Sequence, residues 1–150
     1  MRELSETEFK VFVDAVRGYF QPFGGQLEVR AAYLSEGTPN LHPYIGIIPI
    51  SGAFSGQIYL SAPAALLRQL LRSFNEPNTS EDNLLDAVGE LANTLAGSVR
   101  RHFGPDLEVA VPVTLRPGDP PPRHTRKRAY TIAISWCGFE GLVVVDLAAN

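Results

Sequence analysis

The sequence predicts an α+β fold built from two helix-plus-three-strand units, with one further helix inserted between them. The first observation behind this prediction is the order of periodic segments, which runs helix, three strands, two helices, three strands. The second observation is an internal repeat, in which short stretches of the first half of the chain match stretches of the second half. The chain has 150 residues, of which 45% are hydrophobic, so a single domain over residues 1–150 is expected.

The first unit begins with a helix and continues into three strands. Ser5–Glu8 has the pattern of a capping box, and apolar residues then recur at helical spacing as far as Phe20. The signals that are expected to stop this helix are Pro22, Gly24 and Gly25. The runs "QLEVRAAYL" and "YIGIIPISGAFSGQIYLS" are rich in β-formers, and Gly52–Gly56 predicts a hairpin turn within the second run.

The inserted helix and the second unit follow. Pro63 suits the first turn of a helix with an apolar stripe. That stripe consists of Leu66, Leu67, Leu70, Leu71 and Phe74. A long helix is then expected to begin at a cap on Thr79 or Ser80 and to end before Gly104. We expect "DLEVAVPVTLRPG" to form one strand, "PGDPPPRHTRKR" a polar loop, and "AYTIAISW" with "EGLVVVDLAA" a closing β pair.

Matching stretches connect the two units. In the hairpins these are Ile50-Ser51 with Phe54-Ser55-Gly56, and Ile134-Ser135 with Phe139-Glu140-Gly141. In the helices they are Asp14-Ala15-Val16 and Asp86-Ala87-Val88. This alignment places Gly18 opposite Glu90 and Gln21 opposite Asn93. The first helix therefore lacks the carboxylate and the amide that the long helix carries.

The long helix has a buried stripe and an unusual polar side. Its stripe consists of Leu84, Val88, Leu91, Leu95 and Val99. At roughly 100° per residue, Asp86, Glu90, Asn93 and Gly97 fall on the opposite side. Asn and mid-helix Gly are poor helix formers, and a face that is merely solvated would favour Lys, Glu or Gln. Glu90 and Asn93 are neighbours three residues apart, and Gly97 leaves a notch where another surface can approach.

The stretch "GELANTLAG", which contains Glu90 and Asn93, resembles the signature of the CheC/CheX/FliY chemotaxis phosphatases, and it is closest to the one-site pattern of CheX. The preceding "SGAFSGQIYLS" and the following "VAVPVTLRPG" are similar to that family as well. The resemblance implies a CheC-like fold with an antiparallel-rich sheet and helices on one side. The long helix would lie across the sheet with its polar side outward.

The resemblance also implies a reaction, which is hydrolysis of the aspartyl phosphate on a phosphorylated CheY-like response regulator. Asn93 would orient the attacking water, since an amide can donate and accept hydrogen bonds at once. Glu90 would engage the regulator's active-site lysine. Asp86, Gly97 and Arg100 are expected to contact the partner. No cofactor of its own is implied, because the magnesium belongs to the regulator. Homodimers through sheet edges are implied too, and "GLVVVDLAAN" is a candidate edge.

Composition argues against several other classes of protein. The net charge of −3 is unlike the basic excess of nucleic-acid-binding proteins. No apolar run approaches the length of a membrane span, and the N-terminal stretch is too polar for a signal peptide. One cysteine, Cys137, allows no disulfide within the chain and fits a reducing compartment. The expected location is the cytoplasm.

Other functions for single residues are less favoured by the sequence than the proposed pair of Glu90 and Asn93. Asp86 and Glu90 as paired catalytic carboxylates would lack a cleft that excludes water. The three histidines have no metal-ligand spacing; they are His42, His102 and His124. Cys137 is expected to lie in an apolar strand, where it would be buried and inert. The basic tract from Arg123 to Arg128 is either a solvated loop or an added attraction for an acidic partner.

The alternative function is a non-catalytic module that binds a response regulator or resembles the flagellar switch.

Overall fold

The computed structural model describes residues 2–24 and 26–150, so the predicted stop residue Gly25 lies outside the described part. The helical elements are α1 (Glu6–Phe20), the 3₁₀ turn η1 (Gln21–Phe23), α2 (Ala64–Ser73) and α3 (Glu81–Phe103). The strands are β1 (Leu27–Glu36), β2 (Tyr44–Gly52), β3 (Phe54–Ala62), β4 (Leu107–Val109), β5 (Val113–Leu115), β6 (Arg128–Trp136) and β7 (Phe139–Ala149).

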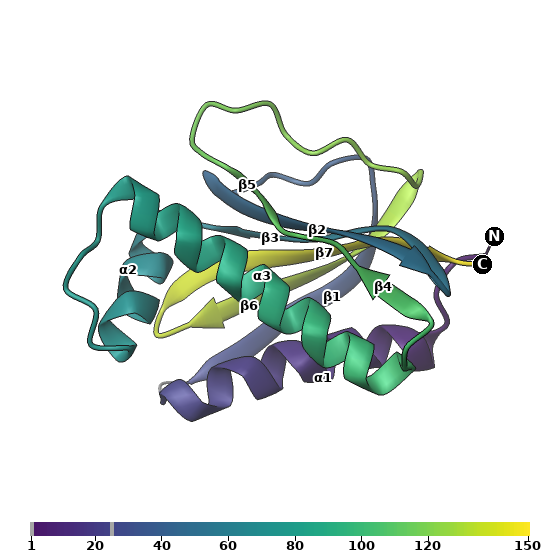
Figure 1. The fold of residues 1–150 in the computed structure, drawn as a ribbon, viewed down its shortest axis with the longest axis horizontal. Coiled ribbons are helices and arrows are strands. Elements are labelled where there is room, and N and C mark those ends of the chain that lie inside the picture. Colours follow the sequence, from purple (N-terminus) through teal and green to yellow (C-terminus); the bar gives the residue numbers. More distant parts are fainter. Residues whose placement is uncertain (1, 25) are drawn as a thin grey trace.

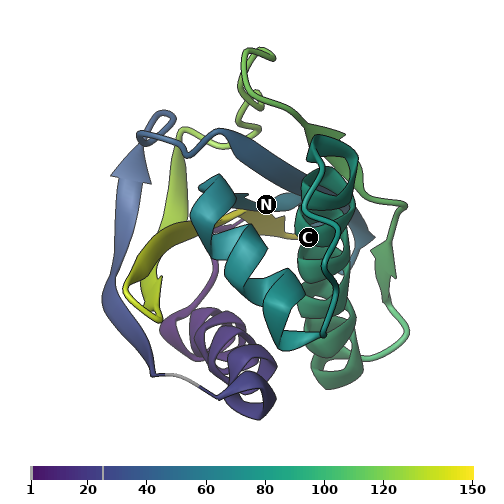
Figure 2. The same cartoon turned by 90° about the vertical axis from the view of Figure 1, so that its left-hand side faces the viewer.

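Within the described residues, seven strands form one sheet in the order β1-β6-β7-β3-β2-β4, and β5 pairs with β2 alongside β4. Each of these strand pairs is antiparallel. The helices α1, α2 and α3 lie on one face of the sheet, and α3 runs across it (Figures 1 and 2). The predicted α+β class, with an antiparallel sheet and helices on one side, is therefore confirmed.

The strand order has the symmetry that the predicted duplication requires. Exchanging β1 with β4 and β5, β2 with β6, and β3 with β7 converts the order into its own reverse. Corresponding residues also pair alike, since Ile50 lies opposite Gly56 in the first hairpin and Ile134 lies opposite Gly141 in the second. Helix α2 has no counterpart in this exchange, as expected for an inserted element.

The strand predicted after the long helix is interrupted. Two short strands, β4 and β5, both pair with β2, and residues 110–112 separate them. Pro112 cannot donate a ladder hydrogen bond, and neither can Pro49 of β2, so regular pairing stops where they lie. The backbone N–H of Ala110 donates instead to the carbonyl of Pro49 at 3.0 Å. The prediction of one continuous strand was wrong for this physical reason.

The candidate edge segment of the sequence does not lie at an edge of the sheet. The apolar C-terminal segment "GLVVVDLAAN" forms most of β7, which lies between β6 and β3 in the middle of the sheet. It therefore has no free edge for a partner, and that expectation was wrong. The edges are β1 on one side and β4 with β5 on the other. Homodimerisation stays a prediction, and it would have to use one of these edges.

Helix α3 is held directly against the sheet. Its apolar stripe is buried, as predicted: Leu84, Val88, Leu91, Leu95 and Val99. On the side of α3 that faces the sheet, Gly46 of β2 has no side chain. A Cβ at that position would collide with the carbonyl of Val88 and lie 3.1 Å from Ala92 Cβ. On its flank, a Cβ on Gly89 would lie 2.9 Å from Thr114 Cγ2 of β5. None of the described helices combines the length and apolarity of a membrane span.

Gly46→Ala is expected to destabilise the domain, because the added methyl group must push the α3 backbone away from β2. Overpacking of this kind costs roughly 1–3 kcal/mol, which lowers the melting temperature by several degrees. The control is Gly18→Ala, since Gly18 has open space around it on α1. Alanine should stabilise that helix by roughly 0.5–1 kcal/mol. Thermal melts compare the two variants, and a Gly46→Ala protein as stable as wild type would disprove the close contact.

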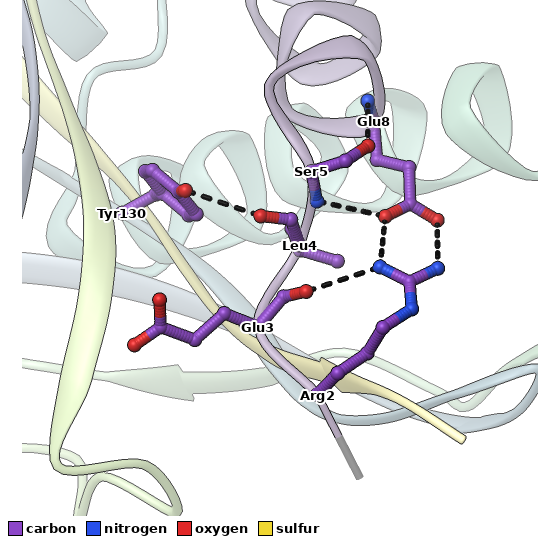
Figure 3. A network of polar contacts seen from close by, with 6 residues as sticks. All are labelled: Arg2, Glu3, Leu4, Ser5, Glu8 and Tyr130. Carbon is purple, nitrogen blue, oxygen red and sulfur yellow. Dashed lines mark hydrogen bonds and ion pairs between the residues drawn. The ribbon is translucent and has the colours of Figure 1, made fainter.

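The N-terminal segment is fastened to the domain by a polar network, which Figure 3 shows. The predicted capping box of α1 is present, with Glu8 N donating to Ser5 Oγ and Ser5 N donating to Glu8 Oε1. Arg2 also donates to both oxygens of Glu8, at 2.7 and 3.0 Å. The Tyr130 hydroxyl donates to the Leu4 carbonyl at 3.1 Å. The hydrogen bonds from Arg2, helped by those from Ser5, lower the pKa of Glu8 to about 2.

This network predicts a specific loss of stability in acid. The folded pKa of Glu8 is about 2 against an ordinary value of 4.5, so its contribution is complete above pH 4.5 and disappears as the pH falls towards 2. Glu8→Gln should therefore be less stable than wild type at neutral pH, and the difference should shrink across that window. Urea melts at several pH values measure it. Glu6→Gln removes a carboxylate from the same helical turn as a control, and a Glu8→Gln deficit that persists at pH 2 would contradict the assignment.

Candidate functional site

Helix α3 presents the predicted polar side to solvent. The side chains of Asp86, Glu90 and Asn93 are exposed, and Gly97 is half-buried. Within the described part of the chain, the side-chain hydrogen bonds of this helix and its cap are made by Ser80, Asn83 and Arg100. Glu90 and Asn93 are not among them, so both groups are available to a second molecule. Ser80 is also the cap of α3, which settles the choice between Thr79 and Ser80.

The carboxylate and the amide offer complementary chemistry from one turn of helix. Asn93 can donate and accept hydrogen bonds at once, whereas an ionised Glu90 only accepts them. Tyr19 of α1 lies in the same groove as Glu90. Burial of its hydroxyl, together with the negative charge of Glu90, raises the pKa of Tyr19 to about 12. Tyr19 is therefore a neutral neighbour of the carboxylate at physiological pH.

Gly97 and Arg100 lie further along the helix and form a separate hollow. This hollow measures about 400 Å³ and is bounded by Arg101, Gly104 and Pro105 as well. The Nε of Arg100 donates to the carbonyl of Leu107 at 3.0 Å, so this side chain also joins the end of α3 to β4. The predicted site residues thus divide into two groups, with Asp86 and Glu90 on one side of Asn93 and the Gly97 hollow on the other.

A groove beside Glu90 was not predicted from the sequence. It measures about 300 Å³ and lies between α1, α2 and α3. Its lining includes Tyr19, Phe74 and Glu76, and no sequence pattern groups these residues with Asp86 and Glu90. Phe74 was expected to be part of the apolar stripe of α2, yet its side chain is 50% exposed. Helical periodicity could not predict this exposure, because α2 ends at Ser73 and Phe74 lies just beyond the helix.

Comparison with known proteins places this chain among chemotaxis proteins. The family model for "Chemotaxis phosphatase CheX" matches residues 44–135, which is more than half of the chain and includes all of α3. The chain belongs to the CheX family. The proposed resemblance of its sequence to CheX is thereby confirmed. A search of curated proteins found no match.

Solved structures share this CheX-family fold over almost the whole chain. A CheC-like superfamily protein from Shewanella sp. PV-4 has a TM-score of 0.84 at 15% identity, covering 97% of this chain and 100% of its own. Chemotaxis protein CheX from Vibrio vulnificus has a TM-score of 0.79 at 17% identity, covering 95% and 99%. The CheX–CheY–BeF3–Mg²⁺ complex from Borrelia burgdorferi has a TM-score of 0.67 at 15% identity, covering 93% and 97%.

The first unit of this CheX-family chain does not repeat the candidate site. Helix α1 ends at Phe20, and Gln21 begins the 3₁₀ turn η1, so the residue aligned with Asn93 lies outside the α-helix. Gly18, aligned with Glu90, carries no functional group. Helix α3 by contrast continues to Phe103, ten residues past Asn93. The two helices therefore differ in two ways: the first lacks the carboxylate and the amide, and its backbone leaves the α-helix before the position that matches Asn93.

The basic tract is held on the opposite face of the sheet from α3. Asp146 of β7 is fully buried, and it accepts hydrogen bonds from the backbone N–H groups of Thr125 at 2.7 Å and Arg126 at 3.0 Å. The Tyr59 hydroxyl and His124 Nε2 lie 2.6 Å apart on the same face. The tract is therefore a surface loop whose backbone is anchored by these contacts, while Arg123, Thr125 and Lys127 are exposed, as a solvated loop predicts. It lies away from Glu90 and Asn93, so the idea that it adds attraction at that face was wrong.

Two other sequence expectations can be compared with the structure. Cys137 is exposed, because it lies in the β6–β7 turn with a φ of 52° and not within a strand. The expectation that it is buried was wrong, since Trp136 is the last residue of the strand and Cys137 is already part of the turn. Among residues 2–24 and 26–150, no group of three or more His, Cys, Asp or Glu residues is arranged to hold a metal ion.

Proposed function

We propose that this chain is a response-regulator phosphatase that hydrolyses the aspartyl phosphate of a CheY-like protein, with α3 as its docking helix. The observation that supports this best is the pair Glu90 and Asn93, exposed and one turn apart on a helix that is packed tightly on the sheet. Membership of the CheX family gives the reaction class. The related Borrelia structure is a complex of CheX with CheY, BeF3 and Mg²⁺, which supports a partner of this kind.

In the proposed reaction, Asn93 enters the regulator's active site beside the phosphoryl group. Its carbonyl oxygen accepts from the attacking water and its NH₂ donates to a neighbouring oxygen, so the water is held in line with the bond that breaks. The water oxygen bonds to phosphorus, the bond to the aspartyl oxygen breaks, and inorganic phosphate leaves. Phosphoryl transfer asks mainly for such positioning and for charge stabilisation. The magnesium that stabilises charge would be held by the regulator.

Glu90 is assigned to binding. Its exposed carboxylate, one turn before Asn93, would pair with the regulator's active-site lysine through charge-assisted hydrogen bonds. This contact would fix how far Asn93 reaches into the partner site. Asp86, Gly97 and Arg100 lie on the same side of α3 and would extend the contact in both directions. We call this exposed side of α3 the helix crest; it carries Asp86, Glu90, Asn93, Gly97 and Arg100. A crest without a deep pocket suits this mechanism, because the pocket in which the reaction takes place belongs to the regulator.

Asn93→Ala should lower kcat on the order of 10²-fold, because the water loses its positioning group. The side chain is exposed, so the variant should fold normally. The measurement is loss of phosphate from a saturating, phosphorylated CheY-like regulator, with circular dichroism to verify the fold. Thr94→Ala, at the adjacent exposed position, is the matched control and should retain its rate. A folded Asn93→Ala protein with wild-type turnover would remove Asn93 from the mechanism.

Glu90→Gln should mainly weaken complex formation, because it keeps the shape of the side chain and removes the charge that pairs with lysine. Loss of a charge pair that becomes buried in a complex predicts a Kd at least about tenfold higher. Titration with a regulator loaded with beryllium fluoride and Mg²⁺ measures this without turnover. Equal affinity of Glu90→Gln and wild type would contradict the assigned role.

A further inference from the structure

The groove beside Glu90 has an apolar floor. Leu70 and Leu71 of α2 and Ala87 of α3 line it, and all three side chains are buried against the domain core. The hydroxyl-bearing ring of Tyr19, from the end of α1, closes one side. Three helices therefore contribute to one hollow of about 300 Å³, directly next to the helix crest proposed to dock on the regulator.

Phe74 forms an exposed aromatic wall of this groove. It is the C-cap of α2, where its backbone N–H donates to the carbonyl of Leu71 at 3.1 Å, and Asn75 then turns the chain away with a φ of 59°. Its ring packs edge-on against Phe23 at a centroid distance of 5.0 Å. Half of the side chain nevertheless remains exposed. The ring is thus held in place by these contacts while part of it remains accessible.

The rim of the groove carries negative charge. Glu76, Asp86 and Glu90 line it, and no lysine or arginine does so among the described residues. The ion pairs of the described chain involve none of these three carboxylates. An apolar ligand would cover carboxylates without pairing them, which is unfavourable. A long cationic side chain fits both features, because its methylene stem packs on apolar surface while its charged end stays at the polar rim. An aromatic wall adds attraction for the cation.

We propose that this groove receives one lysine or arginine side chain of the response regulator, in addition to the active-site lysine that Glu90 engages. This inference rests on the proposed function and extends it. The stem of the cation would lie against Leu71 and Phe74, and its head would meet Asp86 and Glu76. Because the groove and the catalytic crest share Glu90, one regulator surface can fill both. The groove then selects among regulators by their charge and leaves the chemical step to Asn93.

The test separates binding from chemistry. Asp86→Asn with Glu76→Gln removes two charges while keeping the oxygen that accepts the backbone N–H of Asn78. Phe74→Ala removes the aromatic wall. Glu36→Gln and Tyr33→Ala are matched controls, since both residues are exposed and lie on β1, remote from the groove. We expect the double charge variant to raise KM about tenfold with little change in kcat, and to weaken the dependence of KM on salt. Phe74→Ala should raise KM as well.

The assay uses CheY-like receiver domains phosphorylated by acetyl phosphate, with binding measured on the same domains loaded with beryllium fluoride and Mg²⁺. If wild type dephosphorylates a regulator and Asn93→Ala does not, while the groove variants keep the KM and salt dependence of the controls, the groove proposal is overturned and the proposed function stands. If wild type neither binds nor dephosphorylates any receiver, both proposals fail. A lower kcat at unchanged KM in the groove variants would also overturn the assignment, because it would place these residues in the chemical step.

Discussion

The contact between α3 and the sheet is the constraint on which the rest of the structure depends. At Gly46 the strand has no side chain, so the backbone of α3 at Val88 lies directly on β2. At Gly89 the helix has none, so β5 approaches it from the flank through Thr114. Two contacts of this kind fix the rotation of α3 about its own axis and its distance from the sheet. Since side chains on a helix point in fixed directions, the rotation determines which residues face outward.

That fixed rotation turns an ordinary amphipathic helix into a presenting surface. Glu90 and Asn93 project from a helix face whose orientation these contacts hold, so a partner of the proposed kind would meet them in one geometry. Preorganisation of this kind reduces the ordering that must accompany binding. The duplicated architecture gives α1 a similar place in the other half, but α1 ends at Phe20, before the position that matches Asn93. Helix length as well as residue identity therefore explains why only α3 can carry the proposed pair.

Much of the fold could be predicted from the sequence because the signals are local. The capping box at Ser5–Glu8, the turn at Gly52 and the stripe of α3 depend on residues close in sequence, and each was found where the local sequence pattern predicted it. The exposure of Glu90 and Asn93 followed from the same helical phase. Their assignment to a chemistry, in contrast, came from the resemblance to a family, since an isolated carboxylate and amide on a helix are chemically unspecific.

The features that were missed depend on residues distant in sequence. The groove gathers Tyr19, Phe74 and Glu90 from three helices, and no spacing rule relates them. The basic tract is held by Asp146, twenty residues later on a central strand, which only the sheet order reveals. Cys137 was misplaced by a shift of one residue at the end of a strand, where propensity is least informative. The interrupted strand at Pro112 could have been predicted, since proline disrupts a sheet ladder.

The central claim is that the crest of α3 is catalytic and does not merely bind. The most direct measurement is the lifetime of a phosphorylated CheY-like regulator in the presence of a small, substoichiometric amount of the wild-type protein. The account predicts that each molecule of the protein releases phosphate from many regulator molecules in succession. A complex that forms while the phosphate lifetime stays unchanged would contradict it, and would make this chain a binding module with the fold of a phosphatase.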